Sequence, residues 1–242
     1  MSSPACSFYV IDTRYSDVWI IVPAFNEATV IGDVIAGVRS VFDRVVCVDD
    51  GSADDTAGVA RRAGAHVVVH PVNLGQGAAI QTGVEFARAQ PGARLFATFD
   101  ADGQHQVADL VRMIDHLDTT GLDIVIGTRF GSPAATAAVP ALKRLVLRAA
   151  VRCSPRIRRL GLSDAHNGLR VFNRHVADHL EITLNGMSHA GEFIALIAEN
   201  HWRVGEEPIE VIYTDYSKSK GQPLLNGVNI VFDGLVRKRM SR

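Results

Sequence analysis

The amino-acid sequence predicts an α/β fold, with a mostly parallel sheet flanked by helices on both faces. Short apolar runs of strand length alternate with amphipathic segments of helical period through roughly the first 130 residues. Such an alternation requires right-handed crossovers between parallel strands. With 242 residues, of which 47% are hydrophobic, the chain is long enough to bury a substantial core. We therefore expect one large α/β domain.

Five apolar runs are the predicted strands of this sheet. They are short and apolar almost throughout, as is typical of strands that are buried on both faces. Four segments between them repeat apolar residues at helical spacing and are the predicted helices. The strands are expected at 17–23, 44–48, 67–69, 95–99 and 122–127, and the helices at about 30–42, 54–63, 76–89 and 107–117.

The second half of the chain is more basic. A segment at 142–152 places arginines on one side of a predicted helix and apolar residues on the other. We then expect a strand at 167–172, a helix at about 189–201 and an edge strand at 209–213. The predicted organisation is a lead-in at 1–16, a main domain at 17–221 and a C-terminal amphipathic helix at 222–242.

The composition excludes several classes of protein. The formal net charge is −1, so no overall basic field favours nucleic acid as a partner. Three widely spaced cysteines predict neither a disulfide framework nor a zinc site, and they suit a reducing setting. No signal peptide is evident, and no apolar run reaches the ~18 residues of a membrane-spanning helix. We expect a cytoplasmic protein that is not integral to a membrane.

The fourth predicted strand ends in two aspartates, Asp100 and Asp102, followed by Gln104 and His105. Ligands of open α/β sheets bind at the carboxyl ends of the strands. Two carboxylates at that place are costly unless a cation lies between them, and magnesium is usually held by one or two carboxylates plus substrate phosphates. An Asp-rich turn that caps the next helix explains the same residues, so this stretch alone leaves both readings open. His105 is expected to be structural.

Polar residues also follow the other predicted strands. Because the carboxyl ends of parallel strands meet at one edge of the sheet, we expect these side chains to share that edge with the aspartate pair. They are Asn26 and Glu27 after the first strand, Asp49 and Asp50 after the second, and Arg129 after the fifth.

Five short motifs in this chain resemble those of a known enzyme family. In order and spacing they are similar to the motifs of family 2 glycosyltransferases of the GT-A fold, and most closely to polyprenyl-phosphate (dolichyl-phosphate) mannosyl- or glucosyltransferases. The resemblance covers residue 17 to about 215, and a segment at 164–170 adds to it. The motifs occupy 23–27, 49–52, 73–78, 100–105 and 127–130.

The resemblance implies a nucleotide-sugar site along the sheet edge. In the family the first strand tip contacts the nucleotide, an acid of the second tip accepts a hydrogen bond from the base, and a glycine loop lets the backbone approach the donor. Turn geometry, packing and helix capping remain the alternatives at these positions. The residues so implied are Pro23, Ala24, Phe25, Glu27, Asp49, Asp50, Gly75, Gly77, Asp100, Ala101 and Asp102.

The resemblance also implies a divalent metal, Mg²⁺ or Mn²⁺, with Asp100, Asp102 and Gln104 as its ligands. Such an ion neutralises the diphosphate leaving group as the sugar bond breaks. Arg129 is placed by the likeness to meet phosphate at the same centre, and a solvated arginine after a strand is the alternative.

The acceptor is left open between two chemistries. A lipid phosphate is already ionised and needs cations to hold it, whereas a hydroxyl needs a carboxylate base near the anomeric carbon. Glu192 is the candidate base, with an exposed helical glutamate as the alternative. The candidate cations for a phosphate acceptor are Arg144, Arg148, Arg152, Lys218 and Lys220.

The two basic amphipathic helices favour a membrane surface as a further partner. The C-terminal helix ends in the cluster 237–239, and cations near anionic lipid each contribute ~1 kcal/mol. The apolar stripe of this helix could instead dock on its own sheet or on a second copy, which leaves a homodimer open. The expected location is therefore cytoplasmic, peripheral on the inner face of the cell membrane.

The sequence as a whole predicts an inverting, metal-dependent glycosyltransferase. It would move a hexose from a GDP- or UDP-linked sugar to a polyprenyl phosphate or lipid-linked acceptor. Transfer to a glycan or small-molecule hydroxyl in cell-surface polysaccharide synthesis is one alternative, and a non-catalytic sugar-nucleotide binding or scaffold protein is another. The residues expected to carry catalysis are Asp102, Arg129, Glu192 and Lys218.

Overall fold

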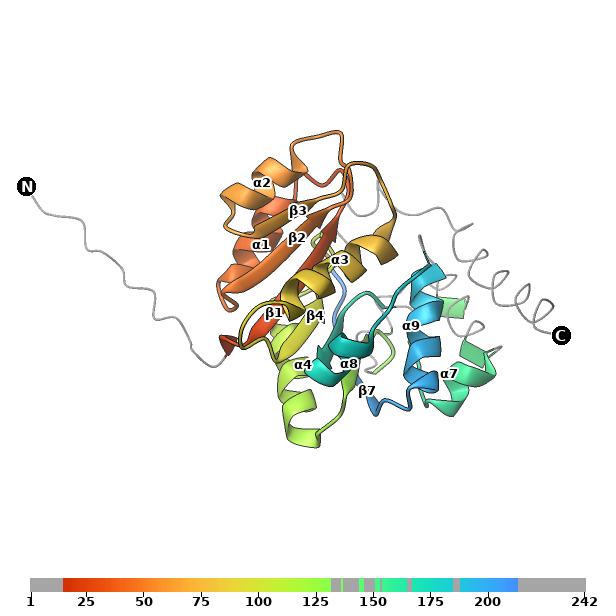
Figure 1. Ribbon diagram of the computed structural model, residues 1–242. Helices are drawn as coiled ribbons and strands as arrows, with labels where there is room; N and C mark the ends of the chain where they lie inside the picture. The colour runs from red at the N-terminus through yellow and green to blue at the C-terminus, as the bar shows by residue number, and fades with distance from the viewer. Residues whose placement is uncertain are drawn as a thin grey trace, which may run out of the picture.

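The protein folds around one seven-stranded sheet with the strand order β3-β2-β1-β4-β6-β5-β7 (Figure 1). This computed structural model describes residues 15–131, 136, 144–145, 151–152, 154–164, 167–184 and 188–212. The strands are β1 (Val18–Ala24), β2 (Arg44–Asp49), β3 (His66–Val69), β4 (Leu95–Thr98), β5 (Ile124–Thr128), β6 (Arg170–Asn173) and β7 (Val204–Pro208).

The sheet is parallel except at one strand. β1 pairs in parallel with β2 and β4, β2 with β3, and β5 with β7. β6 lies between β4 and β5 and runs antiparallel to both. The predicted α/β class with a mostly parallel sheet is confirmed.

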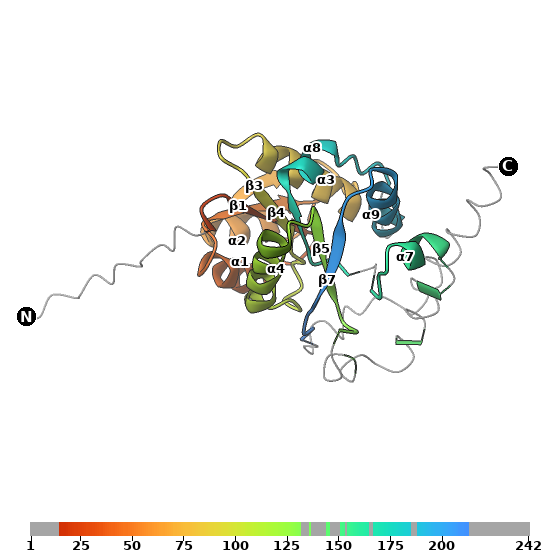
Figure 2. The same cartoon turned by 90° about the horizontal axis from the view of Figure 1, so that it is seen from below.

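Helices cover both faces of the sheet. Figure 2 shows α1, α2 and α4 on one side and α3, α8 and α9 on the other. The helices are α1 (Ile31–Arg39), α2 (Thr56–Arg62), α3 (Gln76–Arg88), α4 (Val107–Thr120), α7 (Pro155–Arg159), α8 (Arg174–His179) and α9 (Ser188–Glu199).

The alternation of side chains along β1 explains why the sheet needs both layers. Every residue of β1 is buried. Ile20 and Val22 pack into a core with α1 and α4, while Trp19 and Ile21 pack into a second core with α3, α8 and α9. Successive residues of a strand point to opposite faces, so a fully apolar strand must be covered twice.

The last strand lies earlier in the sequence than predicted. The edge strand expected at 209–213 is wrong: β7 occupies Val204–Pro208, and Ile209–Ile212 follow it without strand pairing assigned. β7 carries Glu206 and Glu207, so its sequence lacks the alternation of apolar and polar residues that predicts a strand. Its residues are only half-buried, and its pairing with β5 supplies the stabilisation that the pattern lacks.

Two short helices are absent from the prediction, although each has a local signal. At α7, Ser154 accepts a hydrogen bond from the Ile157 N–H at 3.4 Å, and a proline opens the helix. At α8, Asn173 accepts one from the Val176 N–H at 3.0 Å. Serine and asparagine at an N-cap are typical helix starts.

Three predictions of organisation lie outside the part of the chain that the structure describes. They are most of the lead-in at 1–16, the end of the main domain after residue 212, and the amphipathic helix at 222–242. Among the described residues, no helix combines the length and apolar character needed to cross a bilayer.

Candidate active site

The carboxyl ends of β1, β2 and β4 lie side by side at one edge of the sheet (Figure 1). The motifs after these strands are therefore neighbours in space. The loops after β1 and β2 are joined directly: the Asn26 N–H donates to Ser52 Oγ at 2.8 Å, and the Ala53 N–H donates to Asn26 Oδ1 at 2.8 Å. Asn26 has a φ of 54°, a conformation that asparagine tolerates better than most residues.

At the tip of β1, the side chains predicted to meet the nucleotide differ in exposure. Pro23 and Ala24 are buried at the end of the strand. Phe25 is 44% exposed, so its ring is available to a ligand or a partner surface. The Glu27 N–H donates to Thr56 Oγ1 at 2.8 Å, which fixes the start of the turn against α2.

The two acids at the end of β2, Asp49 and Asp50, are buried and build the neighbouring loop. Asp50 Oδ1 accepts from the Leu74 N–H at 2.9 Å, and Asp50 Oδ2 accepts from the Gly75 N–H at 2.8 Å. Asp49 Oδ1 accepts from the Ser52 N–H at 3.0 Å. Gly75 has a φ of 95°, which favours glycine at the turn into α3. Asp50 thus shapes the glycine loop that the sequence assigns to the donor.

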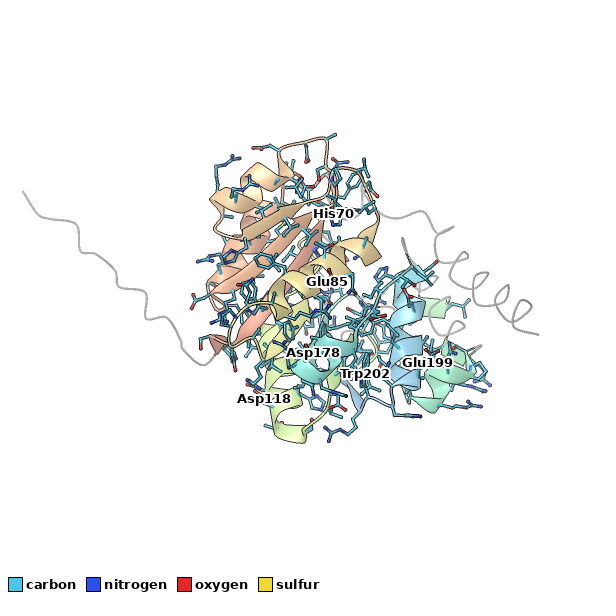
Figure 3. The ribbon with its side chains drawn as sticks, viewed as in Figure 1. His70, Glu85, Asp118, Asp178, Glu199 and Trp202 are labelled. Carbon is cyan, nitrogen blue, oxygen red and sulfur yellow. The ribbon has the colours of Figure 1, made fainter. Side chains whose placement is uncertain are left out.

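His70 completes this arrangement and is labelled in Figure 3. Its Nδ1 lies 2.7 Å from Asp50 Oδ1, and its Nε2 lies 3.0 Å from the Thr82 hydroxyl of α3. Both imidazole nitrogens therefore have partners in a buried setting. The sequence prediction leaves His70 out, because a histidine after a short strand carries no pattern of its own.

Asp100 is held from three sides at the end of β4. Gln76 Nε2 of α3 donates to its Oδ1 at 3.2 Å, and His105 Nε2 lies 3.0 Å from its Oδ2. Gly168, two residues before β6, lies so close that a Cβ there would be 2.6 Å from Oδ1. Burial raises the pKa of Asp100, but the His105 hydrogen bond and the nearby charges outweigh it and hold the pKa below its usual value.

The pKa of Asp102 is raised, in contrast to that of Asp100. Burial and the negative charge of Asp100 raise its pKa, although the Gln104 N–H donates to its Oδ1 at 3.0 Å and opposes the rise. Two carboxylates that repel each other in a half-buried place are stabilised by a cation between them. Ala101, between them, is 5% exposed.

The donor set at this place fits a divalent cation that is shared with a substrate. Asp100 and Asp102 supply carboxylates, and Gln104 follows two residues later. Within the residues that the structure describes, no group of three His, Cys, Asp or Glu side chains could enclose a metal ion. A set of two carboxylates and an amide suits Mg²⁺ or Mn²⁺ completed by phosphate oxygens and water, rather than a closed structural site.

Arg129, at the end of β5, makes a buried ion pair. Its Nε donates to Asp164 Oδ2 at 2.6 Å and its Nη2 to Asp164 Oδ1 at 2.7 Å. The Arg129 N–H adds a third bond to Oδ2 at 3.1 Å. The Asp164 side chain is fully buried, and the Arg129 side chain is 10% exposed. Arg129 directly follows β5, as predicted, and much of its charge is balanced by Asp164; its contact with phosphate stays a prediction.

Glu206 of β7 supports this ion pair. Its Oε1 accepts from the N–H groups of Ser163 at 2.7 Å and Asp164 at 2.9 Å, and its Oε2 accepts from the Ser163 hydroxyl at 2.7 Å. The Ser163 and Thr128 hydroxyls are 2.8 Å apart. These bonds fix the turn that carries Asp164 against the end of β5.

Arg170, the first residue of β6, is a charged group that the sequence prediction does not single out. It is 1% exposed, and its Cζ lies 4.7 Å from the centre of the Phe193 ring. Burial lowers its pKa to about 10, against the raising effect of Asp100 and Asp164. Its guanidinium therefore stays charged at neutral pH, close to both carboxylates.

Glu192 of α9 contacts the loop that precedes its own helix. Its Oε2 accepts from the N–H groups of Thr183 at 3.0 Å and Leu184 at 2.8 Å, and its Oε1 accepts from the Thr183 hydroxyl at 2.6 Å. Gly77 of α3 packs against the Leu184 carbonyl and lies where a Cβ would be 2.9 Å from His189 Cβ. Glu192 thus holds a loop against the start of α3.

The predicted acceptor cations lie only partly within the described chain. Arg144 and Arg152 are in helical conformation, with Arg144 half-buried and Arg152 exposed. Arg144 Nη1 donates to the Thr136 carbonyl at 3.4 Å. The other three, Arg148, Lys218 and Lys220, fall outside the described residues.

This chain is similar to known glycosyltransferases. The model of the family described as Glycosyl transferase family 2 matches residues 19–180. A UDP-N-acetylglucosamine–dolichyl-phosphate N-acetylglucosaminyltransferase of Methanococcus voltae is 27% identical over 241 residues, which cover 91% of this chain and 96% of that protein. A dolichyl-phosphate hexose transferase of Haloferax volcanii is 30% identical over 199 residues, which cover 81% of this chain and 82% of that protein.

A solved structure shares the fold. Glucosyl-3-phosphoglycerate synthase from Mycobacterium tuberculosis, crystallised with Mg²⁺ and uridine diphosphate, matches with a TM-score of 0.64 over 93% of this chain and 80% of that one, at 20% identity. The sheet and its helices thus have the GT-A arrangement. The strand-tip motifs, the fold and the family match agree: the chain belongs to glycosyltransferase family 2 and is an enzyme of the glycosyltransferase class.

Proposed function

We propose that this enzyme transfers a hexose, with inversion at the anomeric carbon, from a nucleoside diphosphate sugar to a polyprenyl phosphate or a lipid-linked acceptor. The observation that carries the proposal is the Asp100–Asp102 pair, which lies at the sheet edge beside the glycine loop that opens α3. Two relatives named for dolichyl-phosphate substrates support the choice of acceptor class.

The donor lies along the carboxyl ends of β1, β2 and β4 in this proposal. Phe25 and Glu27 face the base and ribose, together with Pro23 and Ala24. Asp50 acts chiefly through the loop, because its two oxygens already accept the N–H groups of Leu74 and Gly75. That loop brings the backbone of Gly75 and Gly77 close to the donor.

Asp100, Asp102 and Gln104 would hold Mg²⁺ or Mn²⁺. When bound, the ion would supply positive charge at the diphosphate as its bond to the sugar breaks. Gln76 and His105 keep the Asp100 carboxylate in one orientation. Ordering of this kind matters because charge stabilisation is effective only when the groups are placed in advance.

The chemical step is a substitution at the sugar C1. An oxygen of the acceptor phosphate forms the new bond to C1, while the bond from C1 to the donor's β-phosphate oxygen breaks and its electron pair stays on that oxygen. A phosphate acceptor is already ionised, so this route needs cations and no general base. Arg144, Arg148, Arg152, Lys218 and Lys220 are the proposed acceptor contacts, with Arg129 near the leaving diphosphate.

Transfer to a hydroxyl is the second candidate function, and it depends on Glu192 as a base. Three donors already occupy the Glu192 carboxylate, and they tie it to the Thr183–Leu184 loop. Its oxygens are therefore engaged in holding this loop, with no acceptor hydroxyl among their partners. This observation favours the phosphate route and assigns Glu192 a loop-holding part.

We place the enzyme peripherally on the inner face of the cell membrane, as expected for a protein that meets a lipid phosphate. The basic character of the segment around Arg144 and Arg152 supports this placement, since such cations are attracted by anionic lipid. A homodimer stays compatible with the proposal.

A thermal-shift panel tests the donor site directly. The expected result is that UDP or GDP raises the melting temperature only when Mg²⁺ or Mn²⁺ is present. Asp102→Asn should abolish the metal-dependent shift, whereas Asp115→Asn, at an exposed position of α4, should keep it. A nucleotide shift of equal size with EDTA and in Asp102→Asn would contradict the proposed site.

A further inference from the structure

Arg170 occupies an unusual place in this fold. It lies in the antiparallel strand β6 between the two strands whose ends carry the proposed chemistry. Its register partners are Thr98 of β4, two residues before Asp100, and Ile126 of β5, three residues before Arg129. Its side chain reaches the face covered by α9, where it stacks over Phe193.

The Arg170 side chain is buried, and two of its guanidinium nitrogens are without a hydrogen-bond partner among the described residues. Within the described chain, neither its Nε nor its Nη1 meets an acceptor. Buried arginines ordinarily have their donors satisfied, because removing a charged donor from water is costly. Stacking on an aromatic ring offsets only part of that cost. The carboxylates of Asp100 and Asp164 act on it through space and favour its charged form, but burial outweighs them and lowers the pKa of Arg170.

The two arginines of this region therefore differ in how their charge is balanced. Arg129 makes two side-chain bonds to Asp164, so a carboxylate sits directly against its guanidinium. Among the described residues, Arg170 has no carboxylate in hydrogen-bond contact. In a region of low dielectric, an unmatched fixed charge acts over a longer distance than a paired one.

We propose that Arg170 is a positioning residue for glycosyl transfer, whose buried charge stabilises the nucleoside diphosphate that leaves over Asp100. This inference rests on the proposed function. When the bond from C1 to the β-phosphate oxygen breaks, the diphosphate gains one negative charge. A buried guanidinium that interacts electrostatically with Asp100 offsets this charge without having to reorganise, and its effect is larger on the leaving diphosphate than on the intact donor.

The test compares three variants at full length. Arg170→Met removes the charge and keeps an unbranched side chain against Phe193. Arg170→Lys keeps a charge at the same place. Arg174→Met is the matched control, because Arg174 is four residues away, its side chain is 45% exposed, and it pairs with Asp178 within α8.

We expect Arg170→Met to lower kcat by about 10- to 100-fold, with the donor KM changed by less than about threefold. Arg170→Lys should recover part of kcat, and Arg174→Met should match the wild type. A purely structural Arg170 would lower the melting temperature of both Arg170 variants without this division between kcat and KM. A kcat of Arg170→Met within about twofold of Arg174→Met would overturn the inference.

A binding measurement keeps the inference testable apart from turnover. Isothermal titration of UDP and GDP in the presence of Mn²⁺ should show about tenfold weaker binding to Arg170→Met than to Arg174→Met. Equal binding would overturn the inference. If Arg170→Met does not fold, Arg170→Gln, which also removes the charge, replaces it in both the kinetic and the binding comparison. A wild type that binds the diphosphate with Mn²⁺ and transfers no sugar would contradict the proposed function while leaving this comparison intact.

Discussion

Gly168 provides the sharpest test of how Asp100 is positioned, because a single methyl group there would displace the carboxylate. A Cβ at Gly168 would lie 2.6 Å from Asp100 Oδ1 and 2.7 Å from Cγ, and nearer still to Oδ2. Ordinary van der Waals contact begins at 3.4 Å. The Asp100 carboxylate would therefore have to retreat by about 1 Å, and a misplacement of that size costs roughly 100-fold in rate at a catalytic centre.

The fold should tolerate Gly168→Ala better than the site does. Gly168 has no positive φ, so alanine suits its backbone. The Asp100 side chain is 28% exposed and can move toward solvent, so we expect a loss of about 1 kcal/mol in the free energy of unfolding. The hydrogen bonds of Asp100 to Gln76 and His105 would lengthen with that movement.

Steady-state kinetics with titrated Mn²⁺ is the assay for this variant. We expect kcat/KM for the donor to fall by about 100-fold and the Mn²⁺ requirement to rise. Gly37→Ala is the matched control, because a Cβ at this exposed position of α1 meets nothing within 4 Å. Wild-type kcat/KM and an unchanged Mn²⁺ response in Gly168→Ala would refute the reasoning.

Three further predictions follow from the buried and paired carboxylates. Asp123→Asn should lower the free energy of unfolding by about 1 kcal/mol at pH 7, after allowance for the exposure of Arg203. Because Arg203 holds the pKa of Asp123 at about 2, the difference between variant and wild type in urea denaturation should fade as the pH falls from about 4 to 2. A difference that stays constant over this pH range would contradict the pairing. Asp164→Asn leaves Arg129 underpaired in a buried place and should lower the free energy of unfolding by about 3 kcal/mol, a cost that an unchanged melting temperature would disprove. Asp50→Asn should raise the donor KM about tenfold with little change in kcat, and the same KM as wild type would show that the glycine loop does not depend on it.

The sheet was predictable from the sequence because its strands carry their own signal. β1, β2 and β4 are apolar on both faces, which few structures other than a covered strand accommodate. Polar residues directly after such strands then mark the ligand edge, as the neighbouring ends of β1, β2 and β4 illustrate. Local composition was sufficient to predict a strand wherever the residues of that strand alone showed that both of its faces are buried.

The partners of the charged side chains could not be predicted, since they come from distant parts of the chain. Arg129 is expected at its strand end, but its partner Asp164 is 35 residues away. The burial of Arg170 could not be predicted, because it depends on the place of β6 between β4 and β5 in the sheet. Glu206 marks β7 as polar, although its carboxylate is used by the turn at Ser163. Antiparallel insertion and long-range pairing leave no local pattern.

The most direct test of the central claim is transfer itself. The purified protein is incubated with UDP- and GDP-hexoses, Mn²⁺ and a short polyprenyl phosphate, and the lipid product is measured by mass spectrometry and its anomeric configuration by NMR. We predict an inverted glycosyl polyprenyl phosphate that is lost with EDTA, restored by Mn²⁺, reduced at least about 100-fold in Asp102→Asn and unchanged in Asp115→Asn. Equal product formation with EDTA and in Asp102→Asn would contradict the account.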